Sequence, residues 1–225
     1  MKAMVLCAGR GERLRPLTDH TPKPLVDVGG ETLLERHLRC LGRCGVTEVV
    51  INVSHLGMMI ESAIGDGSAH GLNVVYSREP GTPLETAGGI AHALPLLGPD
   101  PFMVLNGDIW TDYEFDRLRA AISPSVVLVP NAPHHPNGDF EFKAGLACRN
   151  PEKNPLTYAG IAVFHPALFA GLGDEPASLA PILFSLSAKG ALNAEVHCGR
   201  WYDIGSTTRL QQARDAVAAW DGPAR

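Results

Sequence analysis

The alternation of short β-branched runs with helical patterns is the feature that most constrains this fold. Strand-like runs cover residues 2–8, 49–53, 72–77 and 102–105, helical spacing covers residues 33–41, 58–64 and 87–97, and the runs 114–121 and 126–129 continue the alternation. Strand–helix–strand spacing of this kind needs crossover connections, which build a mostly parallel sheet with helices on both faces. The sequence therefore predicts an α/β fold of three layers.

The second half of the chain has a different texture. Segment 130–138 is rich in turn residues, strands are predicted at 140–147 and 157–164, helices near 179–189 and 206–220, and a short strand near 195–198. The sequence contains no internal repeat, low-complexity tract or linker between the halves. We therefore predict one domain over residues 1–225, in which the second half forms a small β-rich insertion on the same sheet.

Composition excludes several classes of protein. The 225 residues are 45% hydrophobic and 19% charged, which supplies a core and argues against disorder. A net charge of -5 argues against a nucleic-acid or anionic-membrane partner, and no apolar run is long enough to span a bilayer. The five scattered cysteines and the lack of a signal-peptide pattern predict a reduced, cytoplasmic chain. With no heptad or exposed apolar stripe, we expect a monomer or weak homo-oligomer.

A glycine-rich basic run follows the first predicted strand. It covers residues 9–18, and Lys23 follows it between two prolines. Ligands bind beyond the carboxyl ends of parallel strands, where glycines let backbone N–H groups approach an anion and cations neutralise phosphate. The run lacks the Gly-Lys-Ser/Thr of a P-loop and the third glycine of a dinucleotide fingerprint. We favour a phosphate cradle over an ordinary surface loop.

Two aspartates are candidates for a metal site. Asp108 ends a buried strand in Asn106-Gly107-Asp108, and Asp203 lies in the run 201–205. Two carboxylates suit Mg²⁺, with phosphates as the remaining ligands. A turn residue and a helix N-cap are the ordinary alternatives for these aspartates, and spacing does not establish that they meet.

Three weaker candidates have ordinary explanations. In the loop 79–89, Thr86 is a possible helix cap and two glycines leave room for a flat ring, although an ordinary loop is the default. His37, Cys40 and Cys44 share a helix face with metal-like spacing, but no partner pair completes a zinc site, so core packing is favoured. His134 and His135 are expected on a loop surface.

In this order, the motifs resemble those of the sugar-1-phosphate nucleotidyltransferase family, over about residues 1–210. The matching runs are Leu6–Thr18, Pro22–Leu25, Glu85–Gly89, Asn106–Asp108 and Trp201–Gly205. Cys7 replaces the family's usual small residue, a mild change on the buried side. The resemblance implies a Rossmann-like three-layer sandwich with a mostly parallel central sheet, a nucleotide-binding half over about 1–112 and a sugar-binding half over about 113–225.

The resemblance implies Mg²⁺-dependent transfer of UMP from UTP to a sugar 1-phosphate. N-acetylmuramate 1-phosphate, a substrate of peptidoglycan recycling, is the favoured acceptor. Compact length and the runs 83–86, 107–113 and 138–140 favour it, and glucose and mannose relatives usually have Gly where Glu85 stands. The alternatives are a mannose-1-phosphate guanylyltransferase, a cholinephosphate cytidylyltransferase and a non-catalytic nucleotide-sugar sensor.

Site residues carry over from the matching motifs. The implied catalytic residues are Arg13, Lys23 and Asp108, and the metal ligands are Asp108 and Asp203. Nucleotide binding is assigned to Gly9, Gly11, Glu12, Arg13, Lys23, Glu85 and Gly88. Sugar-phosphate binding is assigned to Asn106 and Asp139, and Gly160 and Tyr158, outside the matching runs, are expected beside them. Sensors of this fold tend to lose the loop arginine, the lysine or a metal aspartate. The arginine (Arg13), the lysine (Lys23) and both aspartates (Asp108 and Asp203) are present here, which favours an enzyme.

Overall fold

The computed structural model describes residues 1–79, 81, 83–150 and 152–220. Pro80 and Thr82 of the predicted 79–89 loop therefore lie outside the described residues, as do Pro151 and residues 221–225. Within the described part, none of the helices combines the length and apolar character of a membrane span.

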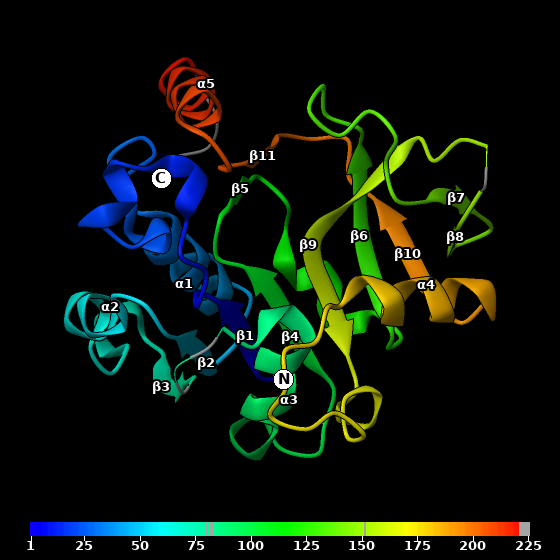
Figure 1. Cartoon of the computed structure of the whole chain (residues 1–225), viewed down its shortest axis with the longest axis horizontal. Coiled ribbons are helices and arrows are strands. Elements are labelled where there is room, and N and C mark those ends of the chain that lie inside the picture. Colours follow the sequence, from blue (N-terminus) through cyan, green and yellow to red (C-terminus); the bar gives the residue numbers. More distant parts are fainter. Residues whose placement is uncertain (80, 82, 151, 221–225) are drawn as a thin grey trace.

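A nine-stranded sheet forms the centre of the molecule (Figure 1). Its order is β3 (Asn73–Arg78), β2 (Glu48–Val53), β1 (Ala3–Leu6), β4 (Phe102–Asn106), β9 (Leu156–Phe164), β6 (Ser125–Pro130), β10 (Asn193–Val196), β8 (Leu146–Cys148) and β7 (Glu141–Lys143). The first four strands are mutually parallel, β9 is antiparallel to both neighbours, and β6 pairs parallel with β10. All strands except β8 and β9 therefore run in one direction, which confirms the predicted mostly parallel sheet.

Helices cover both faces of this sheet, as predicted. One core cluster combines sheet residues with α1 (Leu33–Arg43) and α2 (Gly57–Ile64), and the other combines them with α3 (Glu85–Leu97) and α4 (Ala180–Ala188). Helix α1 begins at a capping box in which Thr32 and Glu35 satisfy each other's backbone N–H groups. Helix α5 (Thr207–Ala218) packs on a third cluster that includes Leu14 and Trp110.

The predicted elements depart from the structure mainly in the second half. The strand predicted at 140–147 is a hairpin of β7 and β8, because Ala144 and Gly145 turn the chain with φ of 50° and 83°. Segment 115–120 is a 3₁₀ helix. The short strand predicted near 195–198 is β10, and two three-residue strands were not predicted: β5 (Ile109–Thr111) and β11 (Trp201–Asp203) pair antiparallel in a separate sheet.

Candidate functional site

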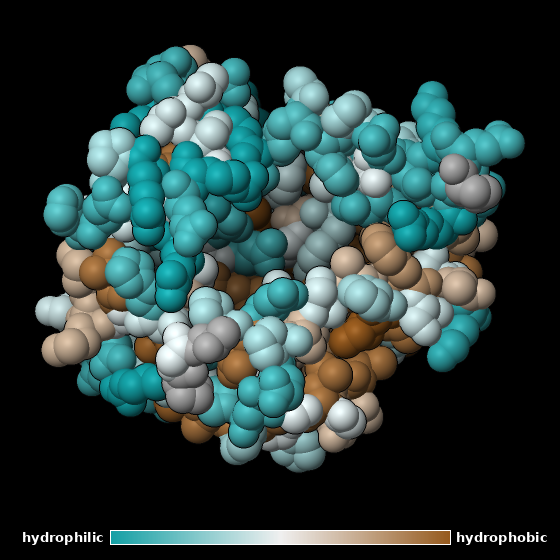
Figure 2. All heavy atoms as spheres, in the orientation of Figure 1, coloured by the Kyte–Doolittle hydropathy of each residue, from teal (hydrophilic) through white to brown (hydrophobic). Residues whose placement is uncertain are grey.

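A cavity of about 610 Å³ opens beyond the carboxyl ends of β1 and β4, within the hollow visible near the centre of Figure 2. Six residues predicted to bind nucleotide line it: Gly9, Gly11, Glu12, Arg13, Lys23 and Glu85. Asn106 and Asp108 line it too. The structure thus brings the glycine-rich loop, the lysine and the first aspartate to one edge of the sheet, as the parallel topology requires.

The glycine-rich loop has a fixed shape. Gly11 adopts φ of 65°, its carbonyl accepts hydrogen bonds from Leu14 N (2.8 Å) and Thr18 Oγ1 (2.8 Å), and a Cβ there would lie 2.9 Å from Thr18 Cγ2. Leu14 is buried in the third core cluster, whereas Arg10 and Arg13 are exposed and line the cavity. A rigid backbone that presents cations to a cavity suits an anionic ligand.

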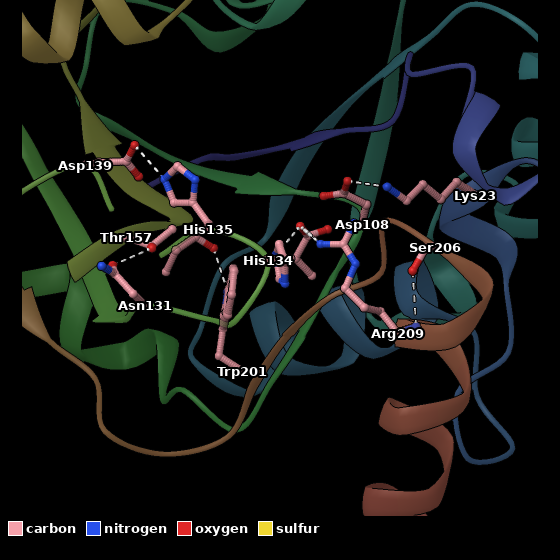
Figure 3. A network of polar contacts seen from close by, with 12 residues as sticks. Lys23, Asp108, Asn131, His134, His135, Asp139, Thr157, Trp201, Ser206 and Arg209 are labelled. Atoms are coloured by element: carbon pink, nitrogen blue, oxygen red, sulfur yellow. Dashed lines mark hydrogen bonds and ion pairs between the residues drawn. The ribbon is translucent and has the colours of Figure 1, made fainter. Parts of the chain in front are cut away.

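Lys23 and Asp108 form an ion pair at the floor of this cavity (Figure 3). Lys23 Nζ lies 2.5 Å from Asp108 Oδ2, and only 8% of Lys23 is exposed. Cys7 also lines this cavity, and burial together with the Asp108 charge raises the pKa of its thiol. The thiol therefore stays protonated and packs as a small apolar group.

The ladder between β5 and β11 brings the two aspartates together. Asp203 lies opposite Ile109, and Ile204 N donates to the Asp108 carbonyl at 2.9 Å. Asp203 Oδ2 accepts from Arg209 Nη1 of α5 at 2.6 Å and lies 3.3 Å from His134 Nε2. Because two non-local strands make this contact, spacing along the chain did not reveal it.

A second cavity of about 320 Å³ meets the first at Asp108. Arg13, Asn106 and Asp108 line both cavities. Ile109, Thr157, Tyr158, Ala159, Trp201, Asp203 and the two histidines complete the wall of the second. His134 and His135 lie on the loop between β6 and β7 with partly exposed side chains, as predicted, but both also line this cavity and each ring contacts a carboxylate.

Three predicted binding residues support the cavities without lining them. A Cβ at Gly88 would lie 2.7 Å from the carbonyl of Glu175, so this glycine permits close packing of α3. Gly160, with φ of 74°, leaves room for the Asn106 side chain. Asp139 lies behind His135. Tyr158 does line the second cavity, and its buried hydroxyl has no hydrogen-bond partner in the described structure.

Sequence reasoning missed Asn52 and Glu79, which line the first cavity. Asn52 accepts from Cys7 N (2.8 Å) and donates to Glu79 Oε1 (2.7 Å), and Glu79 Oε2 accepts from Leu84 N (3.1 Å). The predicted cap at Thr86 is wrong, because α3 begins at Glu85 and the N-cap residue is Leu84. The N–H of Leu84 donates to the Glu79 carboxylate. The sequence did offer a signal for both residues: polar Asn52 lies at the end of one predicted strand, and Glu79 follows the end of the next.

The cluster of His37, Cys40 and Cys44 belongs to the core, as favoured. His37 is 2% exposed, and both cysteines pack against the first core cluster. No group of three or more potential metal ligands occurs among the residues that the structure describes. A protein-only metal cage is therefore absent from this part of the chain.

Comparisons with known proteins agree with this geometry. The family model described as nucleotidyl transferase matches residues 2–140. The chain is 48% identical to an N-acetylmuramate alpha-1-phosphate uridylyltransferase from Neisseria meningitidis serogroup B over 98% of this chain and all of the relative. It is 35% identical to a protein of the same name from Caulobacter vibrioides, over 90% of this chain and 91% of the relative.

A solved structure from Bacillus anthracis, provisionally identified as a glucose-1-phosphate thymidylyltransferase, shares the fold. It superposes with a TM-score of 0.87 at 20% identity, over 100% of this chain and 98% of that one. Sequence similarity along nearly the whole chain and the match of the family model agree with the fold. This chain belongs to the nucleotidyl transferase family.

Proposed function

We propose that this protein transfers UMP from UTP to N-acetyl-α-muramate 1-phosphate, releasing pyrophosphate and UDP-N-acetylmuramate. The observation that carries the proposal is the near full-length similarity to two proteins named for that reaction. The cavities add geometric support, because a nucleotide and an acceptor bound in them would meet at Asp108. In this proposal the enzyme is cytoplasmic, acts in peptidoglycan recycling and is a monomer or weak homo-oligomer.

The first cavity receives the nucleotide in this proposal. Backbone N–H groups near Gly9, Gly11 and Glu12 and the Arg13 guanidinium hold the triphosphate. Glu85, Asn52 and Glu79 lie on the side where the base binds. Gly88 acts from behind by keeping α3 close.

The second cavity receives the sugar 1-phosphate. Asn106 and Tyr158 line it, and Gly160 supports Asn106. An acceptor phosphate placed near Asp108 comes within reach of both Lys23 and Arg13. Holding two anionic substrates side by side requires this concentration of cations.

Members of this family typically use a divalent metal ion, and we propose Mg²⁺ here. The donor set fits: each aspartate engages a cation through Oδ2, and within the described residues neither Oδ1 atom has a hydrogen-bond partner. Two free carboxylate oxygens leave the other positions of an octahedral ion to phosphate and water. Bound there, Mg²⁺ would neutralise phosphate charge and align the two substrates.

The chemistry is an in-line substitution at phosphorus. A phosphate oxygen of the acceptor forms a bond to the α-phosphorus of UTP, and the bond to the bridging oxygen of the β-phosphate breaks. Pyrophosphate leaves with that electron pair. Lys23 stabilises charge on the α-phosphate, and Arg13 stabilises the departing pyrophosphate, so catalysis rests on positioning and fixed charge.

Mannose-1-phosphate guanylyltransferase is the second candidate within the family. The chain is 32% identical to a mannose-1-phosphate guanyltransferase from Xenopus laevis over 91% of this chain, which spans 61% of that relative. Lower identity and partial coverage of the relative favour the uridylyltransferase.

The test is pyrophosphate release with Mg²⁺, pairing UTP, CTP, GTP and dTTP with N-acetylmuramate-, N-acetylglucosamine-, glucose- and mannose-1-phosphate and with phosphocholine. We expect preference for UTP with N-acetylmuramate 1-phosphate, and its loss in Asp108→Ala. Preference for another pair would overturn the proposed acceptor or base and keep the reaction. Tight nucleotide binding without turnover of any pair would indicate a sensor.

A further inference from the structure

The loop between β6 and β7 carries a paired histidine and aspartate. His135 Nε2 lies 3.2 Å from Asp139 Oδ1 (Figure 3). Asp139 Oδ2 accepts a hydrogen bond from Tyr158 N of β9 at 2.9 Å. Asn131 braces the same loop, because its Nδ2 donates to the carbonyls of Pro136 and Asn154 and its Oδ1 accepts from Thr157 Oγ1. The pair is therefore held in a defined position beside β9.

The two members of the pair differ in what they offer a ligand. Both carboxylate oxygens of Asp139 already accept hydrogen bonds from protein groups, and Asp139 does not line the second cavity. His135 lines that cavity, and its Nδ1 has no hydrogen-bond partner among the described residues. Because only the histidine lines the cavity, it is the member of the pair that faces an acceptor bound there.

The carboxylate also fixes which ring nitrogen of a neutral His135 carries the proton. An ionised carboxylate only accepts hydrogen bonds, so the nitrogen that faces it, Nε2, must be the N–H. In the neutral ring Nδ1 is then an acceptor. An acceptor nitrogen at the cavity wall suits a sugar hydroxyl or amide N–H.

We propose that His135 binds the acceptor sugar by accepting a hydrogen bond at Nδ1 from a hydroxyl or amide N–H, and that Asp139 is a positioning residue that sets the tautomer. The inference rests on the proposed function, which places the acceptor in the second cavity. It replaces the direct role in sugar binding that the motif implied for Asp139.

Asp139→Asn separates positioning from direct contact. The amide oxygen still accepts from Tyr158 N, whereas the amide NH₂ donates to His135 Nε2 and moves the ring proton to Nδ1, where it repels the sugar donor. Losing a hydrogen bond that a site is built to make costs roughly tenfold or more. We expect the acceptor KM to rise by about tenfold, with kcat and the UTP KM within about twofold and an unchanged thermal midpoint.

The double variant supplies the decisive comparison. His135→Phe removes the ring nitrogens and should raise the acceptor KM similarly, and adding Asp139→Asn to it should change nothing further. Glu141→Gln is the matched control, because it makes the same carboxylate-to-amide change in β7, where Glu141 pairs with Lys143 outside the cavity. It should leave both KM values unchanged.

The measurements use whichever sugar 1-phosphate the wild-type enzyme turns over best with Mg²⁺ and UTP. Additive effects of the two substitutions would overturn the inference, because Asp139 would then contact the sugar independently of His135. An unchanged acceptor KM in either single variant would overturn it as well. No turnover by the wild-type protein with any sugar 1-phosphate would instead overturn the proposed function.

Discussion

The two cavities are built in different ways. The first takes its wall from continuous stretches of chain, such as residues 6–14 and 106–108, which follow β1 and β4 directly. The second collects short pieces of one to three residues from the β6–β7 loop, β9, β5 and β11. Side-chain contacts hold these pieces together, among them Trp201 Nε1 to the Ala159 carbonyl at 2.8 Å. One cavity follows from sheet topology, and the other depends on tertiary contacts.

The largest effect is expected where the first cavity holds its buried cation. Lys23→Met removes the charge that we place on the α-phosphate, and losing one such group lowers kcat by about 10²- to 10³-fold. Steady-state kinetics at saturating substrates measure it. Lys2→Met is the matched control, because Lys2 pairs with Glu48 at 3.1 Å just before β1, at the end of that strand opposite the cavity. Equal losses in both variants would contradict the assigned role.

The second prediction concerns Gly160, which packs against Asn106, a residue that lines both cavities. In Gly160→Ala the new Cβ would lie 2.6 Å from Asn106 Nδ2, at a φ of 74° that alanine adopts only with strain. We expect a loss of about 2–3 kcal/mol in the free energy of unfolding, measured by urea denaturation, together with lower activity. Gly145→Ala has a similar φ of 83° with nothing within 4 Å, and should cost about 1 kcal/mol. A loss at Gly145 as large as that at Gly160 would show that Asn106 is free to move.

The difference between local features and tertiary contacts also determines which parts of the fold and the site can be predicted from the sequence. The parallel sheet and the glycine-rich loop were predictable because strand periodicity and loop chemistry are local properties. The meeting of Asp108 with Asp203 was not, because it depends on a ladder of three-residue strands that carries no periodic signal. Gly88 and Gly160 were assigned to ligands from the family resemblance, and in the structure both permit close packing, Gly88 against the backbone near Glu175 and Gly160 against the Asn106 side chain.

Acidification should lower the free energy of unfolding through one buried histidine, His37 in α1. Burial and the neighbouring Arg36 lower the pKa of His37 from its usual 6.5 to about 4, so below pH 6.5 the unfolded chain takes up a proton that the folded one does not. This contribution is fully present above pH 6.5 and falls as the pH drops towards 4. Between pH 7.5 and 5 we expect a loss of about 2 kcal/mol in the free energy of unfolding.

Urea denaturation at both pH values measures this loss. His37→Leu removes the titrating group and should flatten the pH dependence over that interval. The same slope in wild type and variant would assign the acid sensitivity to other groups.

The smallest effect on stability is expected at Glu85. Its backbone has a positive φ, which favours glycine, and a glycine is usual at this position in the glucose and mannose relatives. Glu85 lines the cavity with φ of 57°, and a side chain there is strained. Glu85→Gly relieves that strain and adds freedom to the unfolded chain, so unfolding should change by less than about 1 kcal/mol. The KM for UTP should nevertheless rise and selectivity among nucleotides should fall, measured with the four triphosphates.

Ala144→Gly is the matched control, because Ala144 has φ of 50° in the β7–β8 turn outside both cavities, so its backbone relief should leave kinetics unchanged. If the two substitutions proved kinetically alike, Glu85 would have no part in base selection, and the specificity of the first cavity would reside in Asn52 and Glu79 behind it.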